Sequence, residues 1–248
     1  MTALFPEGAQ EQREPKTGGP AGRPGFVAIS HALAVVTVAV AAAVSGATGA
    51  SAQNVITYPF VAGGEKPPAG YPEVAERLAR AYVMVTLVAR GDNITGDGGG
   101  DLHTGSGIVV GRAGYILTAA HIARGRKFAA RITLRDGRTA TGRVVAVDPR
   151  QEVALIKGPA LPGMVPLTPR LAPPPKGTWL MAIGSPGKRW GVATLGRVRE
   201  SDIGERLQYG AWGFDHAIEV GMEVRSGHSG GPVVDMRGRL VGLVASYE

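Results

Sequence analysis

The pattern of hydrophobic and polar residues from position 82 onward predicts a series of short β-strands. Short apolar runs, many of them alternating with polar positions, are separated by turns rich in Gly, Asp and Pro. Such runs are typical of antiparallel strands. Residues 158–176 contain seven prolines and predict a connector between two groups of strands. We expect strands at 82–89, two in the hairpin 105–121, then 131–135, 139–147 and 153–157 before the connector. After it we expect strands at 178–184, 191–199, 216–220, 232–235 and 239–246.

The N-terminal fifth of the chain has a different pattern. Residues 1–25 are polar and punctuated by Pro and Gly, which is typical of a segment without a packed core. Residues 26–44 form a nearly uncharged apolar run of 19 residues, and Ala50-Ser51-Ala52 fits the A-x-A pattern of signal peptidase sites. We therefore expect a leader over 1–52, either a cleaved signal peptide or an uncleaved membrane anchor, because the run is long enough to span a bilayer. The next segments are an extended arm, 53–71, and a short helix that begins at Pro72.

Residues 227–232 read GHSGGP and carry the most informative chemistry in the chain. Gly227, Gly230 and Gly231 allow positive φ and bring backbone N–H groups close to a ligand. Two such N–H groups beside the Ser229 hydroxyl are what an oxyanion hole requires. The alternative is a glycine-rich turn that carries a solvated serine, and the hexapeptide alone favours neither.

A candidate base and two candidate acids precede this serine. His121 ends the second strand of the predicted hairpin and precedes a short helical turn. A serine is a weak nucleophile until an adjacent base takes its proton, and the order His, acid, Ser is one of the known orders of hydrolytic triads. A structural histidine is the alternative interpretation. The acid that orients the imidazole is Glu152, at the start of strand 153–157, or Asp148, in the preceding turn.

The motifs together resemble the trypsin-like (chymotrypsin-fold) serine proteases, and most of all the bacterial HtrA/Deg-type branch. The resemblance covers residues 82–248 and implies an all-β fold of two six-stranded antiparallel Greek-key barrels, at 82–157 and 177–248. It rests on GSGIVV, GYILTAAH, DGRTATGRVVAVDPRQEVALIK, WLMAIGSPG and GHSGGPVVDMRGRLVGLV, which occur in family order.

The resemblance also implies roles for individual residues. His121 matches the general base and Ser229 the nucleophile, while the N–H groups of Gly227 and Ser229 match the oxyanion hole. Glu152 stands where the family has its triad aspartate, one methylene longer but with the same charge. Asp148 matches a family aspartate that is usually structural, so it ranks second for the role.

Specificity and the C-terminal end are further expectations from the resemblance. Glu223 lies six residues before Ser229, near the floor of the S1 pocket, where an acid favours Lys or Arg in the substrate; an exposed loop glutamate is the alternative. Ser246 is a second candidate for the S1 pocket. The family continues past this strand, so we expect the second barrel to lack its last strand and to have an open edge. His228 replaces the residue that usually precedes the nucleophile.

Composition narrows the function classes. The 27 Lys and Arg against 20 Asp and Glu give a basic chain, but the arginines are scattered singly, which argues against nucleic-acid binding. Zero cysteines exclude disulfides, thiol catalysis and Cys-based metal sites, and we expect no metal and no cofactor. Membrane contact is expected only if the leader stays uncleaved.

Two functions remain. The first is a periplasmic or secreted serine endopeptidase that acts on polypeptides; a membrane-anchored form would face the same extracytoplasmic side. The second is a catalytically impaired protein of the same fold that binds unfolded or partner polypeptides. Esterase activity is a minor third alternative, since it uses the same acyl-enzyme chemistry.

Overall fold

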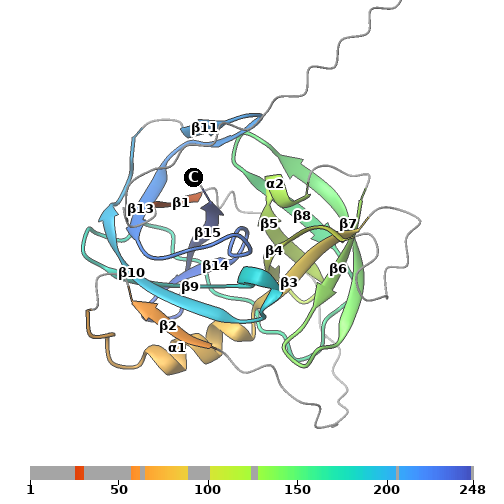
Figure 1. Cartoon of the computed structure of the whole chain (residues 1–248), viewed down its shortest axis with the longest axis horizontal. Coiled ribbons are helices and arrows are strands. Elements are labelled where there is room, and N and C mark those ends of the chain that lie inside the picture. Colours follow the sequence, from red (N-terminus) through yellow and green to blue (C-terminus); the bar gives the residue numbers. More distant parts are fainter. Residues whose placement is uncertain are drawn as a thin grey trace, which may run out of the picture.

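A computed structural model describes the backbone of residues 26–30 and 57–61, and residues 65–88, 101–123, 128–204 and 207–246. Within this part of the chain, almost all regular structure is β-strand, so the all-β fold class is confirmed. The strands form two curved sheets that lie side by side (Figure 1).

The first sheet is a closed six-stranded barrel, as the expected fold class implies. Its strands pair antiparallel in the order β3-β4-β5-β8-β7-β6, and alternate residues point into a core that includes the fully buried Val85, Ile116, Ile132 and Ile156. Closure removes the free edges that an open sheet of this kind would expose. The strands are β3 (Tyr82–Val88), β4 (Asp101–Val110), β5 (Tyr115–Ala119), β6 (Ala129–Thr133), β7 (Thr139–Asp148) and β8 (Val153–Lys157).

The second sheet contains seven strands and curls back on itself. Its order is β13-β1-β15-β14-β9-β10-β2, and β10 also pairs with β13. A core of Leu180, Ile218, Val233 and Val244 fills the space that the sheet encloses. The strands are β1 (Phe26–Ser30), β2 (Thr57–Val61), β9 (Trp179–Gly184), β10 (Val192–Glu200), β13 (Ala217–Gly221), β14 (Pro232–Asp235) and β15 (Leu240–Ser246).

Strand β1 lies where the resemblance implied an open edge. It pairs antiparallel with β13 on one side and with β15 on the other; Ile29 is opposite Ile218 and Val244. Residues 26–30 belong to the apolar run that we assigned to a leader. The sequence did not predict a strand here, because a short apolar stretch does not by itself distinguish a strand from a helix. The rest of that run, 31–44, lies outside the described residues. In the described part of the chain, no helix is long and apolar enough to cross a membrane.

The helices are short and pack at the edges of the barrels. Helix α1 (Tyr71–Ala79) has Pro72 in its first turn, as expected, and buries Val74, Ala75 and Leu78 against the side of the second sheet. Helix α2 (Ala120–Ala123) follows β5 directly and carries His121. The remaining elements are the 3₁₀ turn η2 (Pro186–Lys188) and the hairpin of β11 (Leu207–Tyr209) and β12 (Trp212–Phe214).

Tyr82 joins the two sheets. Its ring is fully buried at the start of β3 and packs edge-on against Trp190, with ring centroids 5.0 Å apart. Around it, residues of α1, β3, β9 and β10 form one apolar cluster. This contact fixes the first barrel against the second beside the segment that contains Ser229.

Candidate active site

Ser229 lies in a tight turn whose glycines are required by packing. Gly227 has φ +102°, and His228 N–H donates to the Arg225 carbonyl at 3.0 Å, so Gly227 occupies the third position of a turn that needs positive φ, as in type II. A Cβ at Gly227 would lie 2.3 Å from the Ser185 carbonyl oxygen. Gly230 has φ +80°, and a Cβ there would lie 2.4 Å from both the Ser106 carbonyl oxygen and the Thr118 hydroxyl oxygen.

The two backbone amides predicted to form the oxyanion hole are the N–H groups of Gly227 and Ser229. Within the residues that the structure describes, neither the N–H of Gly227 nor that of Ser229 donates a hydrogen bond. Both residues are nevertheless buried, with only 4% of Ser229 exposed. Buried backbone donors are rarely left unpaired in proteins, because each costs about 1–3 kcal/mol. Two of them beside one serine point to a binding site for an oxygen atom.

The segment around Ser229 is held by both barrels. Ser106 N–H, on β4, donates to the Ser229 carbonyl at 2.8 Å. On the other side, Gly230 N–H donates to the Val244 carbonyl at 2.7 Å, and Val244 N–H donates to the Gly231 carbonyl at 2.8 Å. The serine therefore sits at the junction of the barrels.

A buried hydroxyl cluster orients the peptide that follows Gly227. The Gly227 carbonyl accepts from the Ser106 hydroxyl at 2.7 Å and from Ser185 N–H at 3.0 Å. The Tyr82 hydroxyl bonds Ser185 Oγ and lies 3.4 Å from Ser106 Oγ. Burial raises the pKa of Tyr82 to about 12, so this hydroxyl stays protonated. None of these three side chains was predicted from the sequence. Their only signal was a polar residue within or at the end of a predicted strand, at a position that the fold buries.

His121 is paired with Glu152. The Glu152 Oε1 atom lies 2.6 Å from His121 Nδ1 and also accepts from His121 N–H at 3.1 Å. The glutamate side chain is fully buried, whereas 24% of the histidine side chain is exposed. With the carboxylate accepting from Nδ1–H, the basic lone pair of the imidazole lies on Nε2.

The backbone at Glu152 explains how a longer acid fits. Glu152 has φ +56°, a left-handed conformation that is unusual for a residue other than glycine. Asp148, the second-ranked acid, organises the preceding turn instead: its Oδ1 atom accepts from Arg150 N–H at 2.9 Å and from Gln151 N–H at 3.2 Å. Asp148 thus shapes the turn that places Glu152 against His121.

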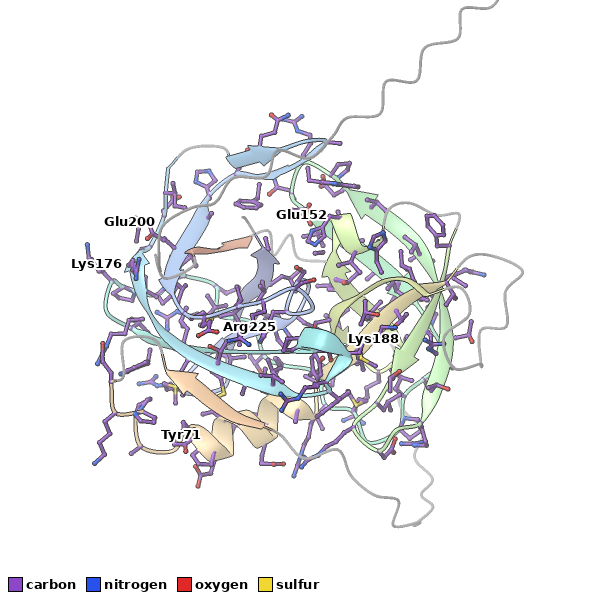
Figure 2. The ribbon with its side chains drawn as sticks, viewed as in Figure 1. Tyr71, Glu152, Lys176, Lys188, Glu200 and Arg225 are labelled. Atoms are coloured by element: carbon purple, nitrogen blue, oxygen red, sulfur yellow. The ribbon has the colours of Figure 1, made fainter. Side chains whose placement is uncertain are left out.

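The segments that carry His121 and Ser229 both contact β4. Gly105 on β4 is the common neighbour: a Cβ there would lie 2.9 Å from the side chain of Ile122, the residue after His121, and 3.0 Å from the Ser229 carbonyl. Glu152 lies beside α2 in Figure 2, and Arg225 lies on the loop that leads to the serine. The α2 turn with His121 and the turn with Ser229 therefore both pack against β4 at Gly105, and Glu152 bonds His121.

The two S1 candidates have different surroundings. Glu223 pairs with Arg225, whose Nε donates to Glu223 Oε1 at 2.9 Å. The Arg225 side chain is 71% exposed and that of Glu223 30% exposed, so the pair lies at the surface. Ser246 pairs with Val27 of β1, and its side chain lies outside the described residues. In the part of the chain that the structure describes, no three His, Asp or Glu side chains gather to hold a metal ion.

A family model and several curated proteins match this chain. The model of the trypsin-like peptidase domain matches residues 105–243, which include His121, Glu152 and Ser229. The putative serine protease HhoA of Synechocystis is 33% identical over 147 residues, 56% of this chain and 36% of its own length. The serine protease PepD of Mycobacterium tuberculosis is 28% identical over 199 residues, 75% of this chain and 40% of its own length.

A solved structure shares the fold. It is the HtrA-type protease AlgW, solved with a tripeptide; it matches with a TM-score of 0.57 and 24% identity over 70% of this chain and 53% of its own. The chain spans about a third of the length of the first curated relatives that it matches.

Proposed function

Because the chain belongs to the trypsin-like peptidase family, we propose that it is an exported serine endopeptidase that uses Ser229, His121 and Glu152. The observation that carries this proposal is that, among the described residues, the N–H groups of the buried Gly227 and Ser229 donate no hydrogen bond. A glycine turn with a purely structural role has no reason to leave two buried donors unpaired.

The proposed reaction follows from the geometry of the site. Ser229 Oγ attacks the peptide carbonyl while His121 Nε2 takes its proton. Glu152, 2.6 Å from Nδ1, stabilises the imidazolium that forms. The N–H groups of Gly227 and Ser229 bind the developing oxyanion. The tetrahedral intermediate collapses, the C–N bond breaks, and His121 gives its proton to the leaving amine. Water, activated by the same histidine, then hydrolyses the acyl-enzyme and regenerates the serine.

Polypeptides are the proposed substrates, and the proposed location is extracytoplasmic. The AlgW structure holds a tripeptide, and related proteins of Brucella are named probable periplasmic serine endoproteases, DegP-like. The apolar run over residues 26–44 supports export, and we propose that these residues are retained, because cleavage after Ala52 would remove β1. The Glu223 carboxylate is already paired with Arg225, so we propose that the S1 pocket has no strong preference for Lys or Arg.

The full chain should react with a fluorophosphonate probe, which phosphonylates an activated serine. Ser229→Ala should abolish labelling, and Glu152→Gln should slow it strongly, with circular dichroism as the control for folding. No labelling of the folded protein would contradict the protease function and favour the alternative, a polypeptide-binding protein without catalysis. Binding of an unfolded model polypeptide by Ser229→Ala shows substrate recognition separately from chemistry.

A further inference from the structure

His228 is a buried titratable residue that the proposed reaction does not use. It lies between the two oxyanion residues, Gly227 and Ser229, and only 2% of it is exposed. Its ring packs against the end of β9, where a Cβ added to Gly184 would lie 2.8 Å from His228 Cδ2 and 2.5 Å from its Cα. The ring therefore has one fixed place next to the catalytic serine.

The Nδ1 atom of this ring closes the turn that contains Gly227. Arg225 N–H points at His228 Nδ1 at 3.2 Å. The Arg225 carbonyl is 3.1 Å from the same nitrogen, but it already accepts from His228 N–H at 3.0 Å. Among the described residues, Arg225 N–H has no other acceptor. The Arg225 N–H favours a neutral ring with its lone pair on Nδ1 and its proton on Nε2, which is buried and has no hydrogen-bond partner among the described residues.

The surroundings favour this neutral form. Burial lowers the pKa of His228 below its ordinary value, and the Arg225 guanidinium acts in the same direction, while the Arg225 and Val192 carbonyls and the Glu223 carboxylate oppose them. The end of β9 presents the uncharged Gly184 to the ring. Protonation would place a second N–H opposite that of Arg225 and so remove the acceptor that closes the turn.

We propose that His228 is a positioning residue: its neutral ring holds the 225–228 turn so that Gly227 N–H faces the oxyanion, and protonation of Nδ1 releases that turn. The proposal rests on the proposed function, since it concerns the same oxyanion hole. It adds the proton on His228 to the pH dependence of the site.

The test is the pH profile of fluorophosphonate labelling by the full chain. His228→Asn is the informative variant, because Asn Oδ1 lies at the same distance along the side chain as His Nδ1, accepts from Arg225 N–H and does not titrate. His228→Leu removes the acceptor altogether. His216→Asn is the matched control, since it removes an exposed histidine, with 70% of its side chain accessible, that pairs with Asp202.

The wild type and His216→Asn should lose labelling rate towards acid pH with a slope of log rate against pH that exceeds 1 and approaches 2. His228→Asn should keep the neutral-pH rate within about threefold and show a slope of 1. His228→Leu should be at least tenfold slower at every pH. The same slope in the wild type and His228→Asn would overturn the proposal, as would full activity of His228→Leu.

Amide exchange separates this proposal from the proposed function. In the wild type, exchange at Arg225 measured by NMR should speed up at acid pH beyond the intrinsic dependence, and His228→Asn should abolish that increase. This readout needs no catalysis. A chain that fails to label but shows the pH-dependent exchange contradicts the protease function and supports the role of His228 in the turn; unchanged exchange contradicts that role.

Discussion

Glu152 reaches the imidazole of His121 from a left-handed backbone position. The carboxylate Oε1 is 2.6 Å from Nδ1 and 3.1 Å from the His121 backbone nitrogen, and the Glu152 φ angle is +56°. One oxygen therefore holds both the ring and the start of the α2 turn. The left-handed backbone costs roughly 1–2 kcal/mol, so the surrounding turn must impose it. Asp148, which binds two amides of that turn, is one source of this constraint.

The first prediction concerns the length and charge of this acid. Glu152→Gln should lower the labelling rate by roughly 10³- to 10⁴-fold, because an amide can donate to Nδ1 and favour the wrong tautomer. Glu152→Asp keeps the charge but withdraws it by one methylene, and a misplacement of about 1 Å can cost roughly 10²-fold. Single-turnover labelling measures both rates. If Glu152→Gln equals the wild type, the glutamate has no role in the reaction.

The second prediction isolates the requirement for glycine at position 227. Gly227→Ala should destabilise the fold by roughly 4 kcal/mol or more and abolish labelling, because the new Cβ would lie 2.3 Å from the Ser185 carbonyl. Gly163→Ala is the matched control: Gly163 also has positive φ, at +87°, but its Cβ would meet nothing within 4 Å. That variant should lose only about 1–2 kcal/mol to backbone strain. Urea denaturation compares the two, and equal losses would contradict the steric argument.

The third prediction concerns the acid stability of the β14–β15 turn. Burial acts to raise the pKa of Asp235, but hydrogen bonds from the Arg239 side chain and from the Arg239 and Arg237 amides outweigh it and hold the pKa below 3.8. The ionised form is therefore favoured more in the folded than in the unfolded chain. This stabilisation is complete above about pH 3.8 and disappears as the pH falls through the folded pKa.

Asp235→Asn should accordingly lower the free energy of unfolding at pH 7, and the difference from the wild type should shrink as the pH falls below 3.8. Urea denaturation at several pH values measures it. Asp202→Asn, at a carboxylate whose side chain is 46% exposed, is the control and should change stability little. A difference at Asp235 that is independent of pH would show that ionisation is not its source.

Sequence patterns predicted the features that depend on local structure. Most strands between β3 and β15 were predicted from the sequence, because alternating hydrophobicity and turn residues are local signals. The turn at Gly227 was predicted because a positive φ angle demands glycine. The hydroxyl cluster could not be predicted in this way. Tyr82 and Ser185 are 103 positions apart, and Ser106 meets Gly227 across 121 positions, so only the closed fold brings them together.

Strand β1 shows the same limit for apolar runs. A window of hydrophobic residues is compatible with a leader, a buried helix or a strand between two others, and only tertiary pairing decides. Residues 26–30 pair with β13 and β15, which are separated from them by most of the chain. Whether the run also directs export remains a prediction.

The last prediction tests β1 as a structural strand in the full chain. Ala28 is opposite Glu219 on β13 and Ala245 on β15, so Ala28→Pro would remove a donor and introduce a ring between two neighbours. Ala34→Pro is the control, because it changes the same apolar run beyond β1. Hydrogen–deuterium exchange should increase across β13 and β15 in Ala28→Pro only, with β9 as the internal reference.

The effect should also reach the catalytic serine. Val244 lies opposite Ile29 of β1 and bonds Gly230 and Gly231 through its carbonyl and its N–H, so loosening of β15 removes support from the residues that follow Ser229. Ala28→Pro should therefore slow labelling by at least tenfold, while Ala34→Pro leaves it unchanged. Equal exchange and equal labelling in the two proline variants would contradict a structural role for β1 and favour a leader that acts outside the barrel.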